Sequence, residues 1–360
     1  MKTLAIETSC DDTSLGIVTY DQGVFTNPVL CAYSQITDHQ PYGGVVPEVA
    51  YRLHEEKILS LLDQIGWDEI MSCDSITVTL EPGLPGSLVV GNAVASMLGN
   101  FLNKPIIRVN HIDGHIFSIL LDRSIDNCPF PWLILTASGG HNEMYIISGT
   151  MEDLVIKKIG YSLDDAAGES FDKVARMLGG SYPGGPWISQ MAQLYQERHM
   201  QSDFTPTLDA IHFKRILLDG KGVNKPQSEI DAHIFDFSFS GMKSQVYQLL
   251  TKHPLDSLSQ DDILWICHEF QECVTDMLIQ KILRGLEHYS VQTIGLVGGV
   301  SANDRLYDKL TTMIEEQYDT HTLVGEKPTV LRPVKKVYST DNAAMIGVVG
   351  ILKKTYSECS

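Results

Sequence analysis

The chain opens with the segment Thr3-Leu4-Ala5-Ile6-Glu7-Thr8-Ser9-Cys10-Asp11-Asp12-Thr13-Ser14-Leu15-Gly16-Ile17-Val18. Two apolar runs flank a polar stretch, and this pattern predicts two strands joined by a turn at residues 9–14. Small hydroxyl and carboxylate side chains at such a tip can hold phosphate oxygens or a hydrated cation. Polar residues are also what a tight turn itself requires. Both interpretations therefore stay open for this turn.

The same pattern returns about 130 residues later. A strand-like run, Trp132-Leu133-Ile134-Leu135, precedes the polar segment Thr136-Ala137-Ser138-Gly139-Gly140-His141 and a second strand at residues 143–147. Each of the two units begins one half of the chain. The recurrence predicts a duplicated architecture with a nucleotide bound between the halves.

Strands alternate with helices around these two units. We predict strands at residues 75–80 and 293–297. Alternation of this kind is typical of an α/β fold with a mixed sheet. Gly298 and Gly299 follow the later strand and precede a helix from about Asp304. Two glycines permit close approach of a phosphate or an adenosine to the helix N-terminus, although the dipeptide alone is weak evidence.

Two histidines four residues apart, His111 and His115, would lie on one face of a helix, one turn from each other. Asn110 is a suitable cap for that helix. Gly114 costs roughly 1 kcal/mol relative to alanine inside a helix, which indicates close approach to its backbone. The pair could share a metal ion, but such pairs also occur by chance, and two ligands do not complete a site. Ile112 follows the first histidine, so the zinc-protease motif His-Glu-x-x-His is absent.

Other polar segments have the composition of a binding rim. Residues 164–173 read as a loop leading into a helix, and residues 182–186 read as a rigid turn, although helix capping explains part of this pattern. We place Asp341 in the first turn of the last helix, where a carboxylate favours capping as well as metal binding. Residues 203–235 are polar and read as an irregular surface insertion.

Composition limits the class of protein. A length of 360 residues suggests about two domains, and 43% hydrophobic with 20% charged residues is typical of a soluble globular protein. No apolar window suits a membrane span and no signal peptide is evident, so we expect a cytoplasmic protein. Seven scattered cysteines without a Cys-x-x-Cys pair favour neither disulfides nor a cysteine zinc site. A formal charge of -18 argues against unaided nucleic-acid binding, so an RNA substrate would need a local basic patch or a partner protein.

Segments along the whole chain resemble the TsaD family of tRNA threonylcarbamoyladenosine transferases, which were once described as glycoproteases. The resemblance rests on residues 6–13, 42–48, 111–115, 138–141, 164–173, 182–186, 236–243, 298–303 and 339–345. It implies the two-lobed α/β fold of the acetate and sugar kinase, Hsp70 and actin superfamily (ASKHA), with a nucleotide cleft between the lobes. We expect an N-terminal lobe at residues 1–125, completed by a C-terminal helix at about 335–360. The C-terminal lobe, with a helical insertion, would span residues 126–334.

The resemblance also implies an activity. The threonylcarbamoyl group of threonylcarbamoyl-AMP would pass to the N6 amine of the adenosine 3′ of the anticodon, in tRNAs that read codons beginning with A. Family members hold one metal, Fe²⁺ in preference to Zn²⁺, and the matching ligands are His111, His115 and Asp341. The family's substrate contacts carry over to Thr136, Ala137, Ser138, Gly139, Gly140, Asp172, Gly185 and Asn303.

Other expected roles follow from the same resemblance. Asp11 would act at the catalytic centre by orienting phosphate or water, and Asp164 with Asp165 would shape the rim. ATP, ADP or AMP could also occupy the cleft. Archaeal and eukaryotic relatives carry a metal-ligating tyrosine where this chain has Thr136, so water or substrate is expected at the fourth metal position. Expected partners are tRNA, a degenerate paralogue (TsaB-like) and a small P-loop ATPase (TsaE-like), with no membrane.

Two other functions share some of these features. A metalloprotease of the glycoprotease type would use the same histidine pair, but its general base has no obvious position without His-Glu-x-x-His. A non-catalytic scaffold of the ASKHA fold is expected to lose the histidines and the glycine loops, which this chain retains.

Overall fold

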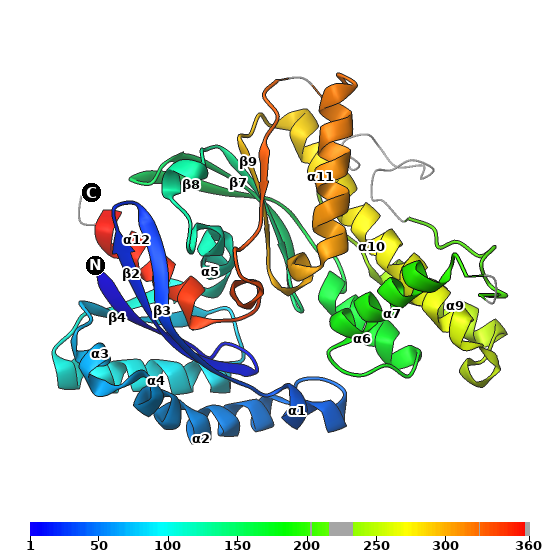
Figure 1. Ribbon diagram of the computed structural model, residues 1–360. Helices are drawn as coiled ribbons and strands as arrows, with labels where there is room; N and C mark the ends of the chain where they lie inside the picture. The colour runs from blue at the N-terminus through cyan, green and yellow to red at the C-terminus, as the bar shows by residue number, and fades with distance from the viewer. Residues whose placement is uncertain (202–203, 216–232, 324, 357–360) are drawn as a thin grey trace.

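The computed structural model describes residues 1–201, 204–215, 233–323 and 325–356, and two five-stranded sheets form its framework (Figure 1). The first sheet has the order β3-β2-β1-β4-β5 and contains β1 (Lys2–Glu7), β2 (Asp12–Asp21), β3 (Val24–Ser34), β4 (Ser75–Glu81) and β5 (Ile106–Asn110). The second has the order β10-β9-β6-β7-β8 and contains β6 (Trp132–Ala137), β7 (Asn142–Thr150), β8 (Asp153–Tyr161), β9 (Thr293–Val297) and β10 (Thr329–Leu331).

The two sheets share one topology, which confirms the predicted duplication. In each, the first strand pairs antiparallel with the second and parallel with the fourth: β1 with β2 and β4, and β6 with β7 and β9. The outer antiparallel strands β3 and β8 were not predicted. Both are edge strands and are exposed along much of their length, so they lack the apolar runs that mark a buried strand.

Helices form the layers outside and between the sheets. The helices that precede the second sheet are α1 (Ile36–His39), α2 (Pro47–Ile65), α3 (Trp67–Met71), α4 (Pro85–Leu102) and α5 (His111–Phe117). Those that follow β8 are α6 (Ala167–Met177), α7 (Gly184–Arg198), α9 (Ser240–Lys252), α10 (Gln260–His288), α11 (Asp304–Asp319) and α12 (Ala343–Tyr356). None of the described helices is long and apolar enough to cross a bilayer.

The hydrophobic core is divided by these layers into three clusters. One joins α2 and α4 to the first sheet, and another joins α6, α9 and α10 to the second. The third lies between the sheets and includes apolar side chains of α5 and α12. Although α12 ends the described chain, it packs on the first sheet, and a Cβ on Gly350 would lie 2.0 Å from Oγ1 of Thr77. A glycine is therefore required for α12 to lie this close to β4.

The predicted surface insertion is only partly described. Residues 204–215 and 233–235 contain no helix or strand, in agreement with an irregular segment, but Leu208 and Phe213 are buried in the cluster around α10. Phe235 is buried in the same cluster. The surface assignment is wrong for these three side chains, because apolar residues within a polar stretch still enter the core. Residues 202–203 and 216–232 lie outside the described residues. The six described cysteines are free, and Cys359 also lies outside.

Candidate metal centre and substrate cavity

The two histidines lie on a short helix at the carboxyl end of β5. The side chain of Asn110 accepts hydrogen bonds from the backbone N–H groups of Ile112 and Asp113, at 2.8 and 3.4 Å, so it caps α5 as predicted. His111 and His115 are 6% and 1% exposed, and their ring centroids lie 4.7 Å apart. The spacing of four residues thus brings both imidazoles to one buried face.

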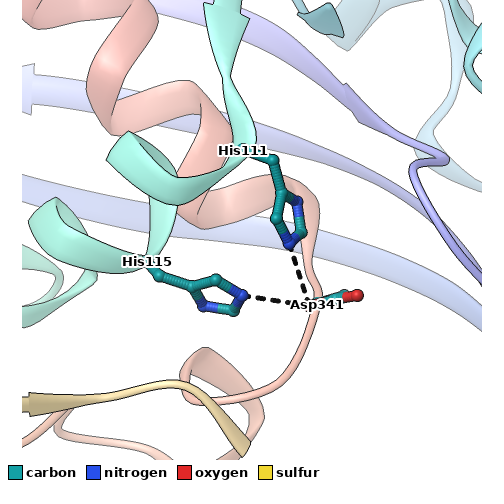
Figure 2. A group of neighbouring side chains, drawn as sticks. All are labelled: His111, His115 and Asp341. Atoms are coloured by element: carbon teal, nitrogen blue, oxygen red, sulfur yellow. Dashed lines mark ion pairs between the residues drawn. The ribbon is translucent and has the colours of Figure 1, made fainter. Parts of the chain in front are cut away.

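Asp341 completes the cluster from the other end of the chain (Figure 2). Its Oδ1 lies 3.5 Å from Nε2 of His111 and 3.1 Å from Nε2 of His115. Its predicted position in the first turn of the last helix is wrong, because α12 begins at Ala343 and Asn342 supplies the cap by accepting from the backbone N–H of Met345. Asp341 therefore precedes the helix, and its carboxylate faces the histidines instead of capping.

These three side chains suit a divalent cation. One ligand atom from each lies within 4.8 Å of the others, and this is the only such group of three or more among the residues the structure describes. Nε2 of His115 is buried and makes no hydrogen bond within that part of the chain, although it lies close to the carboxylate. Two imidazole nitrogens and one carboxylate oxygen are a ligand set that Fe²⁺ and Zn²⁺ accept, and three protein ligands leave a position open.

Two residues behind His111 were missed from the sequence. Nδ1 of His111 lies 3.1 Å from Oγ of Ser9 and 3.3 Å from Oε2 of Glu7, which is fully buried. Thr79 donates to the same Glu7 oxygen, and the backbone N–H of Ser9 donates to the other. A ligand histidine commonly contacts a carboxylate through its second nitrogen, which fixes the ring. The available signal was the single acidic residue in the apolar run at residues 3–7.

Charge is concentrated at this cluster. Burial alone would lower the pKa of His111, but the carboxylates of Asp341 and Glu7 outweigh it and raise that pKa well above its usual value. Burial would likewise raise the pKa of Asp341, yet the two histidines hold it well below the usual range. A cation bound by these atoms must compete with protons, so its affinity falls in acid.

A cavity of about 950 Å³ lies beside the cluster, between the two sheets' polar loops. Asp11 and Asp12 line it from the β1–β2 tip, Gly139 from the β6–β7 turn, and Asn303 from the start of α11. Thr340, the residue before Asp341, also lines it. The cavity thus lies between the two repeated hairpin tips and reaches the residue next to Asp341, although its lining does not include the three ligands themselves. It has the volume of a small-molecule site.

The predicted substrate residues of the β6–β7 unit fall into two groups, one buried in the strand and one in the turn. Thr136 and Ala137 are buried within β6, so their side chains belong to the sheet. Ser138 makes a tight turn with His141, through backbone and side-chain hydrogen bonds. A Cβ on Gly139 or Gly140 would meet no atom within 4 Å, so this turn presents bare backbone.

Three predicted residues lie on the opposite wall of the cavity. Oδ1 of Asp172 accepts from the backbone N–H of Gly184 at 2.6 Å, which fixes the start of α7. Gly185 lies in the first turn of that helix, so the predicted rigid turn at 182–186 is wrong from Gly184 onward. Asn303 caps α11, and its Nδ2 donates to Ser189 and Gln271. Asp172, Gly185 and Asn303 all line the cavity.

The acidic residues at the rim differ in their surroundings. Asp164 accepts from the backbone of Phe239 and Ser240, and Asp165 pairs with Lys173 and Lys243, so both attach the 161–173 segment to α9. Asp12 is only partly satisfied: Ser34 hydrogen-bonds its carboxyl group, but its Oδ1 is buried without a hydrogen bond in the described structure. Burial and the neighbouring Asp11 raise the pKa of Asp12 to about 7.

Comparison with known proteins places this architecture in a family. The profile of the TsaD family, described as tRNA N6-adenosine threonylcarbamoyltransferase, matches residues 29–348. The chain belongs to the TsaD family.

Full-length relatives agree with this assignment. A protein of Persephonella marina named tRNA N6-adenosine threonylcarbamoyltransferase is 36% identical over 353 residues, which cover 97% of this chain and 89% of the relative. A protein of Kosmotoga olearia with the same name is 37% identical over 357 residues, covering 98% and 93%.

Solved structures support the fold of this TsaD-family chain. HypF of T. kodakarensis matches with a TM-score of 0.53 at 12% identity, covering 99% of this chain and 48% of HypF. A full-length HypF in the phosphate- and nucleotide-bound form matches with a TM-score of 0.54 at 10% identity, covering 100% of this chain and 56% of that structure. At this identity the likeness concerns the fold alone, and it agrees with the predicted α/β architecture.

Proposed function

We propose that this TsaD-family transferase moves the threonylcarbamoyl group of threonylcarbamoyl-AMP to the N6 amine of the adenosine 3′ of the anticodon, in tRNAs that read codons beginning with A. The observation that carries the proposal is the cluster of buried His111 and His115 with partly buried Asp341, beside a cavity of about 950 Å³. Family membership supplies the reaction class. We assign the lobes to residues 1–125 with about 335–360, and to residues 126–334.

Residues of the second lobe hold the donor, and residues of the first lobe hold the cation. The bare backbone at Gly139 and Gly140, together with Gly185, permits close approach of the phosphate and ribose, and Asp172 and Asn303 shape the opposite wall. AMP, ADP or ATP would occupy the same place. His111, His115 and Asp341 hold one divalent cation, Fe²⁺ in preference to Zn²⁺, which when bound supplies Lewis-acid polarisation.

In the transfer step, the N6 nitrogen attacks the carbamoyl carbonyl carbon, the bond from that carbon to the phosphate oxygen breaks, and AMP leaves. The attacking amine loses one proton. Asp12 is suited to accept it, because Oδ1 is buried without a hydrogen-bond partner in the described structure and the pKa is raised to about 7. Asp11, the adjacent carboxylate on the cavity wall, orients the phosphate or a water.

Reconstitution tests the proposal directly. The purified chain with its partner proteins is incubated with threonylcarbamoyl-AMP and unmodified tRNA, with and without chelator, and the nucleosides are analysed by mass. We expect threonylcarbamoyladenosine only where metal is retained. Absence of the modified nucleoside from the metal-loaded mixture would refute the assignment.

A protease is disfavoured by the position of the one buried glutamate at the cluster. Glu7 contacts Nδ1 of His111, whereas Asp341 approaches Nε2, so Glu7 supports a ligand from behind. It therefore does not face the position that a general base on a metal-bound water would need. A chelator-sensitive cleavage of casein by the pure protein would favour the protease instead.

We propose a cytoplasmic complex with a degenerate paralogue and a small P-loop ATPase. An apolar stripe on α4 offers the paralogue a surface: Val89, Met97 and Phe101 follow one face of the helix and are 66%, 52% and 78% exposed. The net charge of -18 also favours partners that supply part of the tRNA-binding surface.

A further inference from the structure

A second cavity of about 430 Å³ adjoins the first. The two share Asp172 and Tyr182 in their linings, so they lie next to each other. This side chamber is otherwise lined by Gln40, Pro41, Tyr42, Gly43, Arg176, Gly180 and Ser181. It therefore lies between the segment before α2 and the end of α6, which come from the two halves of the chain.

Arg176 differs from the other cationic residues of the two cavities. Arg305 is held by both carboxylate oxygens of Glu272, and Lys336 pairs with Asp304. Arg176 makes no hydrogen bond or ion pair with any residue that the structure describes, and it is exposed. Burial raises the pKa of the nearby Asp172 carboxyl, and Arg176 partly offsets this rise without forming an ion pair. In a protein of net charge -18, a guanidinium that no described carboxylate holds directly can attract an anion beside the substrate cavity.

The guanidinium of Arg176 packs against the backbone of Gly43. A Cβ on Gly43 would lie 3.1 Å from Nη2 of Arg176, so the side chain lies directly over Gly43. Gly43 has φ 68°, a left-handed conformation that favours glycine. The neighbouring ring of Tyr42 is 62% exposed, and Tyr182 lines the chamber where it meets the substrate cavity.

We propose that the side chamber receives a nucleotide of the tRNA anticodon loop, with a backbone phosphate on the guanidinium of Arg176 and a base against Tyr42 or Tyr182. Arginine binds phosphate through a planar fork, and aromatic rings stack on the bases of single-stranded RNA. The chamber opens beside the substrate cavity, so a nucleotide held there places its neighbour near the donor. The inference rests on the proposed transfer to tRNA.

Steady-state kinetics of Arg176→Ala in the reconstituted system test this role. We expect the KM for tRNA to rise about tenfold while the KM for threonylcarbamoyl-AMP stays unchanged, because one phosphate contact is lost. The slope of log affinity for tRNA against log salt should decrease by about 1. Arg176→Lys should recover part of the affinity, since it restores the charge without the fork.

Lys327→Ala provides the control for loss of one positive charge. Lys327 is exposed. The first residue of α11 lines the substrate cavity, and Lys327 lies beyond the other end of that helix. Lys327 is therefore remote from the chamber. An equal rise in the KM for tRNA in the two alanine variants would refute tRNA binding in the chamber. A rise in the KM for threonylcarbamoyl-AMP alone would also refute it, and would show that Arg176 contacts the phosphate of the donor. A wild-type protein that forms no product refutes the proposed function instead.

Discussion

At the residue scale, the site depends on how each ligand is supported. His111 contacts Ser9 and Glu7 through Nδ1 while Nε2 faces Asp341, so its ring cannot turn without losing one set of contacts. Burial raises the pKa of Glu7, but His111 beside it lowers the pKa overall, so this carboxyl is ionised. Glu7 is therefore a positioning residue for the metal ligand.

Glu7→Gln should weaken metal binding by about 10- to 100-fold, the range for loss of a carboxylate behind a ligand histidine. The measurement is metal competition against a chromophoric chelator. Glu48→Gln, an exposed change in the first turn of α2, is the matched control. Identical metal affinities in the two variants would show that the Glu7 carboxylate does not support the ligand histidine.

Asp12→Asn should remove the rise of kcat/KM with pH. The wild-type kcat/KM is expected to rise with pH through about 7, because Asp12 must lose its proton before it can accept one from the amine. The asparagine variant should be slower and flat across this range while retaining its metal. A variant that keeps the rising limb would assign that ionisation to another group.

At the scale of elements, α5 and α12 set the distance between the metal ligands. Gly114 was predicted to permit close approach to its backbone, and the approaching group is α12. A Cβ there would lie 2.8 Å from Cδ1 of Ile346 and 3.1 Å from Cγ of Met345. The constraint on Gly114 is therefore helix packing. Because α5 carries both histidines and Asp341 directly precedes α12, this contact also fixes the cluster.

Gly114→Val should lower the unfolding free energy by about 2 kcal/mol, the usual cost of overpacking a core, and should reduce bound metal. Thermal unfolding and metal content measure the two effects. Gly139→Ala, whose Cβ would meet no atom within 4 Å, should leave the melting temperature unchanged. An equally stable, fully metallated Gly114→Val would contradict this account.

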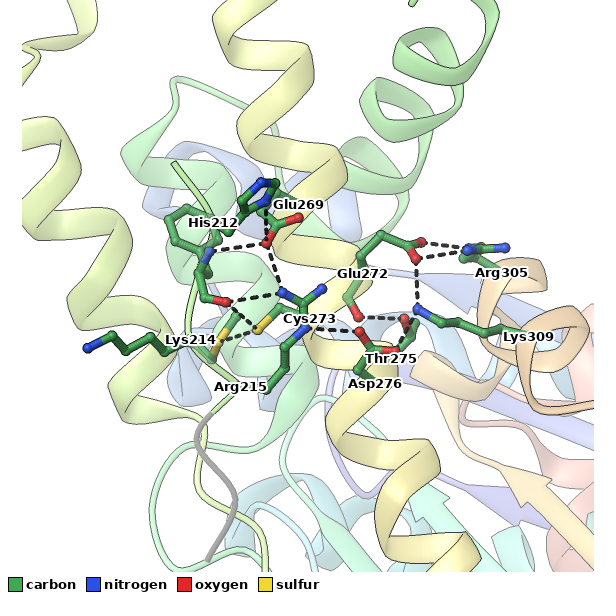
Figure 3. Close-up of polar contacts among 12 residues, drawn as sticks. His212, Lys214, Arg215, Glu269, Glu272, Cys273, Thr275, Asp276, Arg305 and Lys309 are labelled. Atoms are coloured by element: carbon green, nitrogen blue, oxygen red, sulfur yellow. Dashed lines mark hydrogen bonds and ion pairs between the residues drawn. The ribbon is translucent and has the colours of Figure 1, made fainter. Parts of the chain in front are cut away.

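A second contact between elements is ionic and joins α10 to α11 (Figure 3). Glu272 accepts from Arg305 at 2.6 and 2.8 Å and from Lys309 at 2.7 Å, while Lys309 also pairs with Asp276. Burial would raise the pKa of Glu272, but the two cations lower it to about 2.

Glu272→Gln should reduce stability at neutral pH by about 2 kcal/mol, because two partly buried cations lose their partner. The folded pKa lies below the usual 4.5, so the wild-type advantage is complete above about pH 5 and shrinks as the pH falls toward 2. Urea unfolding at several pH values measures the difference. A gap that widens in acid would contradict the assigned sign.

At the scale of the whole molecule, two copies of one sheet topology place their hairpin tips on a common cavity. The first sheet supplies Asp11 and Asp12, the second supplies Gly139, and the segment before α12 returns Thr340 to the same place. Function therefore depends on the relative position of the lobes. On the first sheet, α4 leaves Val89, Met97 and Phe101 exposed, and this is the surface that we propose for the paralogue.

Phe101→Ser should weaken binding of the paralogue at least tenfold with little change in the melting temperature, since this side chain is 78% exposed. Calorimetric titration of the two proteins measures the affinity. Trp67→Ser on α3, which is 44% exposed, is a control outside the stripe. Unchanged binding by Phe101→Ser would place the interface elsewhere.

Much of the structure followed from local patterns in the sequence. Apolar runs around polar tips predicted both hairpins, strand–helix alternation predicted an α/β fold, and the four-residue spacing predicted one face for His111 and His115. These features depend on residues that are neighbours in the chain, so periodicity and capping determine them.

Contacts between distant segments were decided only by the tertiary structure. The family resemblance groups Asp341 with the two histidines, but no local pattern does so. The distances within that cluster, the support of His111 by Glu7 and the packing of Gly114 on α12 require chain closure over long loops. No local pattern encodes such contacts, because they arise when the two sheets bury their apolar faces on the shared layer of α5 and α12. The sequence supplied the ligand types, and the packing of that layer brought them within reach of one ion.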